Sequence, residues 1–296
     1  MLMKKRVALL LALILIFALC GCDQPEKPVL RVAMSPDFPP MEFIDGTKTG
    51  QDRYVGFDVS LAKYLAKGLV MKLEIVPMDF EDCQDAVADG EVDMAISGFS
   101  WLPQREERFN LSDTYHASDN TTNQVLLTTA ENASRFAVAE DMVGVYIGAQ
   151  RASLQEWLIS EQLKDAYTVP FQDLQEGVEL LLTGKIDALA VAEGNADAIL
   201  TATPGLAKPA FRFTLTAELT DNLILLKKGN DSLTEKVNAL LAQAQSEGLY
   251  SQWYAQALEQ AQSVTTVVLD KTGTVTEGHP TVTDILTADE SALLQL

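Results

Sequence analysis

A repeated pattern constrains the fold of this chain most strongly. Residues 79–94 have the pattern of a helix that ends at a glycine turn and leads into a strand, with Gly-Glu-Val-Asp-Met at the end. Residues 173–188, at an ungapped offset of 94 residues, repeat this order and end in Gly-Lys-Ile-Asp-Ala. A helix that leads into an apolar strand is typical of parallel sheets with right-handed crossovers. The repeat therefore predicts an α/β protein of two similar lobes, each with a mostly parallel sheet flanked by helices.

The first repeated strand is followed by an arginine that can bind a carboxylate. Residues 92–97 are apolar enough for a buried strand, and the sequence GFSWLPQR follows them at 98–105. Pro103 suits the first turn of a helix. Ligands bind at the carboxyl ends of strands in open α/β sheets, and arginine binds a carboxylate through two parallel N–H groups. The segment predicts a carboxylate site at Arg105, and the alternative is a solvated arginine in a charged surface run.

Several other motifs occur in order along the chain. A strand at 31–34 leads into a proline-rich loop at 35–43, and a Gly-Phe-Asp-Val motif opens a helix over 61–67. The motifs are F-P-P-x-E-F, G-F-D-V, G-x-S-x-x-P-x-R and the segments 109–115, 147–155, 187–189 and 226–230. Together they resemble bacterial extracellular solute-binding protein family 3, the polar amino-acid-binding lipoproteins of ABC importers, over about residues 30–262.

The resemblance implies a type II periplasmic-binding-protein fold, in which a two-crossing hinge joins the lobes and lets them close on a ligand. Lobe 1 would hold residues 30–116 and 217–262, and lobe 2 residues 117–216. The hinge candidates are 116–122 and 213–218. The implied function is capture of an amino acid or a related small carboxylate and its delivery to an ABC permease. We expect a monomer with no catalytic residue, no metal and no cofactor.

The resemblance also implies which side chains of lobe 1 contact the ligand. Phe38 and Phe57 would flank its side chain, although plain core packing is the alternative for both. Gly98 and Ser100 would offer backbone and hydroxyl groups. Arg105 would pair with the α-carboxylate.

In lobe 2, Ser153 would add a hydroxyl and an N–H at a helix start, where the helix dipole favours an anion; a simple N-cap is the alternative. Ala192 stands where the family usually has the aspartate that receives the ligand's ammonium. Glu193 is adjacent, but neighbouring strand residues face opposite sides, so it substitutes only if the strand end twists or bulges. Ala152 replaces the usual glycine, and a positive φ there would cost roughly 1 kcal/mol.

The loop after the first strand bears on the class of ligand. Ser35 occupies the position that is often aspartate in relatives that bind cationic side chains, although Asp37 and Glu42 lie in the same loop. The sequence does not favour a basic amino acid. We expect a neutral or polar amino acid, or a derivative whose amine is weakly recognised.

The N-terminus has the pattern of an exported lipoprotein. Lys4, Lys5 and Arg6 precede a 13-residue apolar core, which is too short to span a bilayer. Residues 19–22 resemble a lipobox, so that residues 1–22 would be the signal peptide with its lipobox, and Cys22 would be the lipidated first residue after cleavage, with 23–29 as a tether. A two-chain anchor is sufficient for stable attachment. We therefore expect an extracytoplasmic protein anchored to the membrane.

Composition limits the partners and the covalent chemistry. The chain has 42 acidic and 22 basic residues, and its net charge of −20 argues against a nucleic-acid partner. It has three cysteines. Since Cys20 would leave with the signal and Cys22 would be lipidated, only Cys83 would remain, and no disulfide is expected.

Residues 263–296 do not fit the pattern of a binding protein. The Asp-Lys-Thr-Gly-Thr run at 270–274 resembles the phosphorylation site of heavy-metal P-type ATPases, with Asp270 as the matching residue. No nucleotide domain or transmembrane bundle accompanies it, so we expect an appended, non-functional fragment. Two other functions remain open: a dehydratase-like enzyme of the same fold and a sensory ligand-binding protein. An enzyme would need an acid/base pair in the cleft, and neither His116 nor His279 lies in the cleft motifs.

Overall fold

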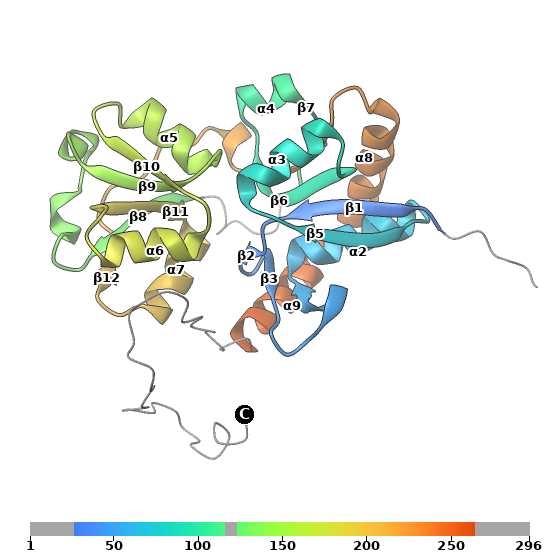
Figure 1. The fold of residues 1–296 in the computed structure, drawn as a ribbon, viewed down its shortest axis with the longest axis horizontal. Coiled ribbons are helices and arrows are strands. Elements are labelled where there is room, and N and C mark those ends of the chain that lie inside the picture. Colours follow the sequence, from blue (N-terminus) through green and yellow to red (C-terminus); the bar gives the residue numbers. More distant parts are fainter. Residues whose placement is uncertain (1–26, 116–122, 264–296) are drawn as a thin grey trace, which may run out of the picture. The chain divides into compact units, whose positions relative to one another are not determined.

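The structure is a computed structural model that describes residues 27–115 and 123–263. One five-stranded sheet has the order β5-β1-β6-β13-β7 (Figure 1). Strands β1 and β5 are parallel, as are β1 and β6, whereas β13 is antiparallel to β6 and β7. The strands are β1 (Val29–Met34), β5 (Lys72–Pro77), β6 (Met94–Ser100), β7 (Phe109–Leu111) and β13 (Asn222–Lys227). We call the part built on this sheet lobe 1.

A second five-stranded sheet has the order β10-β9-β11-β8-β12 and defines lobe 2. Strands β9, β10 and β11 are parallel neighbours, and β8 is antiparallel to β11 and β12. The strands are β8 (Gln124–Thr129), β9 (Tyr146–Gln150), β10 (Tyr167–Phe171), β11 (Ala188–Ala192) and β12 (Leu206–Ala207). The two-lobed α/β fold predicted from the repeat is confirmed, while the exact lobe boundaries stay predictions.

The repeated sequence forms the same unit in each lobe. Helix α3 (Phe80–Asp89) ends at Gly90 and leads to β6, and helix α6 (Leu174–Leu182) is followed by Gly184 and then β11. Both glycines have the positive φ that ends a helix, at 80° and 70°. The repeated aspartates also play one role: Asp93 accepts a hydrogen bond from the Arg31 backbone N–H, and Asp187 accepts one from that of Tyr146. Each aspartate thus ties its strand to the parallel neighbour.

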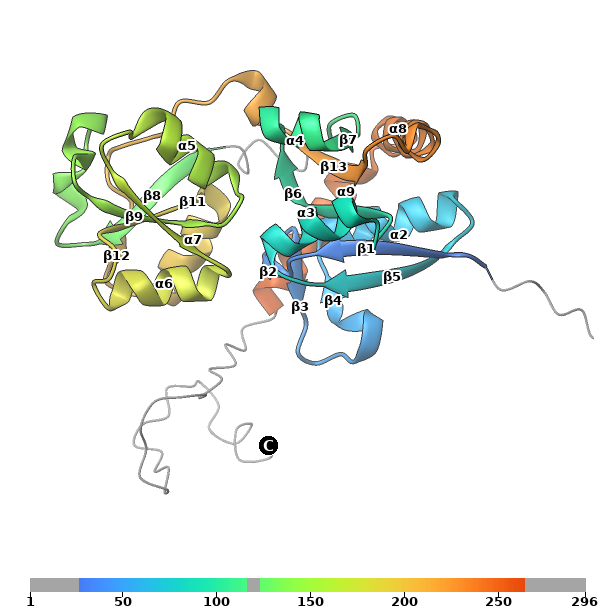
Figure 2. The ribbon, with the colours of Figure 1, turned by 45° about the horizontal axis from the view of Figure 1, so that its top comes forward.

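Helices cover both faces of each sheet because strand residues alternate between the faces. In lobe 1, α2 (Phe57–Gly68), α8 (Asp231–Ser246) and α9 (Leu249–Ser263) supply one core, and α3 supplies the other. In lobe 2, α5 (Leu154–Gln162) covers one face, and α6 with α7 (Glu193–Ala202) covers the opposite one (Figure 2). None of the described helices is both long enough and apolar enough to cross a membrane.

Short elements complete the architecture around the cavity. A small sheet pairs β2 (Asp37–Phe38), β3 (Glu42–Ile44) and β4 (Tyr54–Val55). Helix α4 (Pro103–Arg108) follows β6. Single 3₁₀ turns lie at Gly50–Arg53, Ala133–Arg135, Ala139–Met142 and Ala217–Leu219.

Local expectations compare well with these elements. Pro103 occupies the first turn of α4, as predicted. The helical region near the C-terminus breaks at Gly248, between α8 and α9. The proline-rich loop differs, because it contains the hairpin strands β2 and β3. Strand β6 also runs beyond the predicted residue 97 to Ser100, where it pairs with β13 across an irregularity in register.

The chain crosses from lobe 2 back to lobe 1 before β13. Arg212 still bridges to Val125 of lobe 2, whereas Asn222 bridges to Tyr115 of lobe 1. The hinge candidate at 213–218 lies within this interval, and its hinge role stays a prediction. The other candidate, together with the signal, Cys22 and Asp270, lies outside the described residues.

Candidate ligand-binding site

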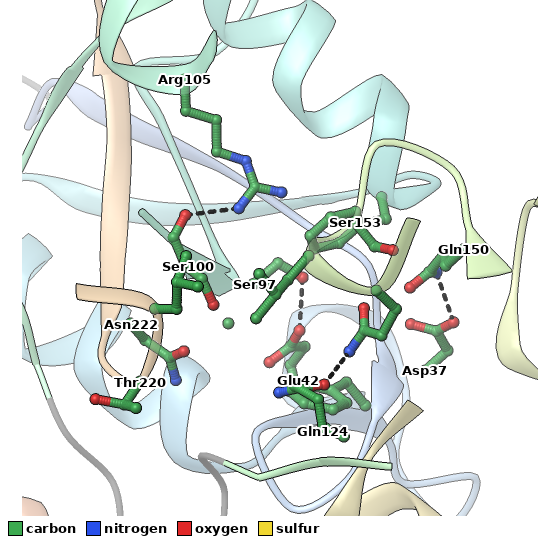
Figure 3. A pocket seen from close by; sticks show the side chains of 17 residues that line it. Asp37, Glu42, Ser97, Ser100, Arg105, Gln124, Gln150, Ser153, Thr220 and Asn222 are labelled. Atoms are coloured by element: carbon green, nitrogen blue, oxygen red, sulfur yellow. Dashed lines mark hydrogen bonds between the residues drawn. The ribbon is translucent and has the colours of Figure 1, made fainter. Parts of the chain in front are cut away.

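Side chains from both lobes line one cavity (Figure 3). Five of the seven predicted ligand-binding residues are among them: Phe38, Gly98, Ser100, Arg105 and Ser153. The polar wall contains residues that the sequence did not single out as ligand-binding: Asp37, Glu42, Ser97, Gln124, Gln150, Gln155, Thr220 and Asn222. Glu42, Gln150 and Gln155 lie within motifs named above, whereas the others come from separate elements that only the fold brings together.

Arg105 is the cationic side chain of the cavity wall and is only 2% exposed. It is held there because α4 begins directly after β6, which turns the arginine back over the strand end. Its guanidinium lies 5.6 Å from the ring centroid of Phe80 and 5.1 Å from that of Phe99. These rings fix the plane of the guanidinium and favour its charge.

The hydrogen bonds of Arg105 leave donors for a ligand. Nη1 donates to the carbonyl oxygen of Ser100 and Nη2 to that of Ala152, both at 2.7 Å, and Nε donates to Gln84 Oε1 at 3.3 Å. A guanidinium has five N–H donors. Two therefore remain without a partner among the described residues, one on each terminal nitrogen, and that pair suits the two oxygens of a carboxylate.

Arg105 is a buried charge that no acid of the described chain neutralises. Burial lowers the pKa of its guanidinium from 12.5 to about 9, so that it stays charged at neutral pH. A buried cation is costly unless an anion or several hydrogen bonds compensate it. Three bonds do so in part, and an anionic ligand would complete the compensation.

Of the two phenylalanines predicted to contact the ligand, Phe38 lies at the cavity and Phe57 lies in the core. Phe38 lines the cavity and lies over Gly98, where an added Cβ would come within 2.9 Å of its ring. Gly98 also has a φ of 59°, so that both geometry and space require glycine there. Phe57 is fully buried in a cluster with Tyr115 and Trp253 and does not line the cavity. Its geometry fits core packing, the alternative considered for it.

The turn before α5 brings the Ala152 carbonyl group of lobe 2 to Arg105. Ser153 is the N-cap of α5, and its hydroxyl accepts a hydrogen bond from the Glu156 backbone N–H. Ala152 has a φ of 56°, the positive value whose cost was considered above for an alanine in place of the usual glycine. Its carbonyl oxygen accepts hydrogen bonds from Arg105 and Gln84 of lobe 1. This strained alanine therefore lies at the contact between the lobes beside the proposed carboxylate site.

The strand end at β11 does not supply an acidic group to the cavity. Ala192 lines the cavity, whereas Glu193 does not. The carboxylate of Glu193 accepts hydrogen bonds from Asn123 at 2.8 Å and Lys208 at 3.0 Å, and these bonds lower its pKa. Strand β11 ends at Ala192 and α7 begins at Glu193, so the chain turns the glutamate away from the cavity.

Two buried carboxyl groups lie together in lobe 1, and one of them, Glu42, lines the cavity. Glu42 accepts a hydrogen bond from the Ser97 hydroxyl at 2.5 Å, and Asp58 accepts bonds from the Gly98 N–H at 2.9 Å and the Tyr115 hydroxyl at 3.1 Å. Burial raises the pKa of both, to about 6 for Asp58, and the two carboxyls are hydrogen-bonded to each other. Glu42 Oε2 and Asp58 Oδ1 have no other partner among the described residues, and a proton shared between the two carboxyls would satisfy both.

Asp37 joins the lobes at the edge of the same cavity. Its carboxylate accepts hydrogen bonds from the Ser35 hydroxyl of its own loop at 2.9 Å and from two groups of lobe 2. These are the Leu174 backbone N–H at 3.1 Å and the Gln150 side-chain amide at 3.3 Å. Burial raises the pKa of this carboxyl. Within the described residues, no group of three or more His, Cys, Asp or Glu is spaced to hold a metal ion.

A cavity lined from two α/β lobes, with a buried arginine in its wall, is typical of a protein that binds a small ligand in a cleft. Comparison with known proteins gives the family: the bacterial extracellular solute-binding proteins, family 3, match residues 30–260. The chain belongs to this family and is therefore an extracytoplasmic solute-binding protein.

Three known proteins illustrate the similarity. The arginine-binding extracellular protein ArtP of Bacillus subtilis is 28% identical over 85% of this chain and 98% of its own length. The second is the substrate-binding protein AbpA of an amino acid ABC transporter from Streptococcus pneumoniae, whose crystal structure contains bound L-arginine. It superposes with a TM-score of 0.70 and 26% sequence identity, and the match covers 79% of this chain and 95% of that one. A cyclohexadienyl dehydratase of Pseudomonas aeruginosa is 29% identical over 55% of this chain and 59% of its own length.

Proposed function

We propose that the protein captures an amino acid or a related small carboxylate between its lobes and delivers it to an ABC permease. The observation that carries this proposal is the pair of N–H donors left on the terminal nitrogens of Arg105, in a cavity lined from both lobes. The relatives ArtP and AbpA bind arginine, which supports an amino acid as the ligand class.

The rest of the cavity wall suits a polar ligand. The amides of Gln124, Gln150 and Asn222 offer both donors and acceptors, and Phe38 offers an apolar face. Closure of the lobes on the ligand would complete the site, since groups from both sides are needed. Lipidation at Cys22 would keep the protein near its permease. As a monomer, each protein molecule would bind one ligand molecule.

Calorimetric titration with the amino acids tests this function. We expect Arg105→Ala to weaken the binding of the preferred amino acid by more than about 2 kcal/mol, because a desolvated carboxylate loses its charged partner. The matched control is Arg108→Ala, an arginine of the same helix that does not line the cavity. Arg108 is instead ion-paired with Asp85 at 2.7 Å. Arg105→Lys keeps the charge but loses the two-pronged geometry, and circular dichroism checks that each variant is folded.

The results separate the possibilities. Equal affinity of the Arg105→Ala variant and the unaltered protein would remove Arg105 from the site. If no amino acid binds and other carboxylates do, the amino-acid version is wrong. For the anchor, Cys22→Ser is expected to move the protein from the membrane fraction to the soluble fraction, and an unchanged distribution would refute lipidation at this residue.

A second candidate is an enzyme that eliminates water from a carboxylate substrate. Two observations favour it: one relative is a dehydratase, and Glu42, whose pKa is raised by burial, lines the cavity. We prefer the binding protein because Ser97 and Asp58 already engage both oxygens of Glu42. Product formation from a bound carboxylate, monitored by mass spectrometry and lost in Glu42→Gln, would instead support the enzyme.

A further inference from the structure

Gln84 of helix α3 connects the two lobes beside Arg105 and does not itself line the cavity. It is only 5% exposed and lies on the buried face of its helix. Its amide oxygen accepts a hydrogen bond from Arg105 Nε at 3.3 Å. Its amide nitrogen donates to the carbonyl oxygen of Ala152 in lobe 2 at 3.3 Å and to that of Phe80 in its own helix at 3.4 Å. A buried amide is costly unless its polar atoms have partners, and these bonds supply them.

The two partners fix which way the amide of Gln84 faces. A guanidinium only donates hydrogen bonds, and a carbonyl oxygen only accepts them. The oxygen of Gln84 therefore faces Arg105, and its nitrogen faces Ala152. An apolar side chain at this position would lose both bonds. A carboxylate would keep the bond to Arg105 but would have no donor for the carbonyl oxygen of Ala152.

The carbonyl group of Ala152 is held in place by the turn before α5. The Ala152 N–H donates to the Glu156 carboxylate at 2.8 Å, and the Glu156 N–H donates to the Ser153 hydroxyl at 3.1 Å. This pair of bonds is close to a capping box and fastens the turn to the start of the helix. The carbonyl oxygen of Ala152 is thus a fixed point of lobe 2, and it accepts bonds from both Arg105 and Gln84 of lobe 1.

Lobe 1 supplies two of the three acceptors of Arg105, and lobe 2 supplies the third. The Ser100 carbonyl and the Gln84 side chain belong to lobe 1, whereas the Ala152 carbonyl belongs to lobe 2. If the lobes separate, both bonds to Ala152 break, because this acceptor moves with lobe 2. The bond between Arg105 and Gln84 can persist, since both residues move with lobe 1.

We propose that Gln84 is a positioning residue that ties Arg105 to lobe 2 when the cleft closes and so prolongs the life of the closed complex. The proposal rests on the proposed function, because Arg105 is the residue that would bind the carboxylate of the ligand. Gln84 acts through Arg105 and Ala152. Loss of its donor should speed dissociation more than it slows association, because a ligand enters while the lobes are apart.

Stopped-flow fluorescence measures the two rates separately. Trp101 is the reporter, because it directly follows β6 of lobe 1 and packs against the hydrophobic clusters of both lobes. The probes are L-glutamine, L-histidine and L-arginine, which share an α-carboxylate and differ in the charge of the side chain, and the rates are measured with the tightest of the three. Calorimetry gives the equilibrium affinity, and melting temperatures show that each variant is folded.

Three substitutions are compared with the unaltered protein. Gln84→Met keeps the length of the side chain without its hydrogen bonds, and we expect it to raise the dissociation rate about tenfold and to change the association rate by less than about threefold. Gln84→Glu loses the donor and adds an anion beside the guanidinium. It should raise the dissociation rate and also lower the association rate by at least about fivefold, because the anion competes with the carboxylate of the probe. The matched control is Gln51→Met, which removes two hydrogen bonds to the Ile75 backbone within lobe 1.

The outcomes distinguish the role of Gln84 from the proposed function. If Gln84→Met leaves the dissociation rate unchanged, or weakens binding no more than Gln51→Met does, the positioning role is refuted while amino-acid binding stands. If Gln84→Glu associates as fast as the unaltered protein, the contact with Arg105 is unimportant and the proposal is again refuted. If none of the three probes binds to the unaltered protein, the proposed function fails for these amino acids, and the role of Gln84 fails with it. If Gln84→Met does not fold, Gln84→Glu decides alone, since it also lacks the donor to Ala152.

Discussion

Replacing Glu42 by glutamine is expected to stabilise the protein at neutral and alkaline pH. Glu42 and Asp58 are both buried, and burial raises the pKa of each carboxyl. We expect them to share one proton, so that raising the pH forces a second negative charge into the core of lobe 1. A glutamine at position 42 keeps an oxygen for the Ser97 hydroxyl and offers an N–H donor to Asp58. Asp58 would then ionise with three donors around it, since Gly98 and Tyr115 already donate to it.

The size of the expected pH-dependent change in the free energy of unfolding follows from the pKa of Asp58. Folding raises that pKa from 3.8 to about 6, a difference of roughly two pKa units or about 3 kcal/mol. Because the folded pKa is the higher one, the stabilising contribution is full below pH 3.8 and is lost as the pH rises through about 6. The pKa of Glu42 is also raised, which adds to the loss in the same direction. Tyr115 stays neutral, because burial and Asp58 raise its pKa.

Urea unfolding between pH 5 and pH 8 measures the effect. We expect the free energy of unfolding of Glu42→Gln to exceed that of the unaltered protein by about 1–3 kcal/mol at pH 8, and the difference to shrink toward pH 5. Glu74→Gln is the control, because Glu74 is half-exposed and its ion pair with Arg31 is a surface pair. A Glu42→Gln variant that is less stable at pH 8, or a stability difference that does not depend on pH, would refute the shared proton.

Three further predictions concern the backbone and the tail. Ala152→Gly should raise the free energy of unfolding by up to about 1 kcal/mol, since glycine adopts a φ of 56° without strain; a lower value in urea unfolding would contradict this. Gly98→Ala should weaken ligand affinity and lower the free energy of unfolding by about 1–2 kcal/mol, because the added Cβ would meet the Phe38 ring. Gly46→Ala is the control, since there is open space around Gly46. Equal effects of the two substitutions would count against this reasoning. Deleting residues 263–296 should leave the calorimetric affinity and the melting temperature nearly unchanged, and a large loss of either would show that the tail contributes to the fold.

Much of the fold could be predicted because its signals are local. The glycines at 90 and 184 require a positive φ, and each marks the passage from a helix to a strand. Pro103 begins α4, and Ser153 caps α5 through a hydrogen bond to a residue three positions away. Such signals depend on neighbours within a turn or two, so the sequence alone is sufficient for them.

The binding site was predicted in part. The position of Arg105 follows from the strand and helix that flank it, whereas its lobe-2 partner, Ala152, is 47 residues away in the sequence. The role expected for Glu193 depended on how β11 ends, and only the start of α7 decides that. Phe57 shows the same limit, because helix α9, far along the chain, brings the aromatic rings that enclose it.

The sequence by itself determined two repeated α/β lobes and an arginine in the turn after a buried strand, because backbone geometry and periodicity are set by adjacent residues. Only the tertiary structure decided that Glu42 and Asp58 are buried together with raised pKa values and that Asp79 and Asn195 line a common hollow. The physical reason is that desolvation and charge coupling depend on distances between segments far apart in the chain, which no local pattern records.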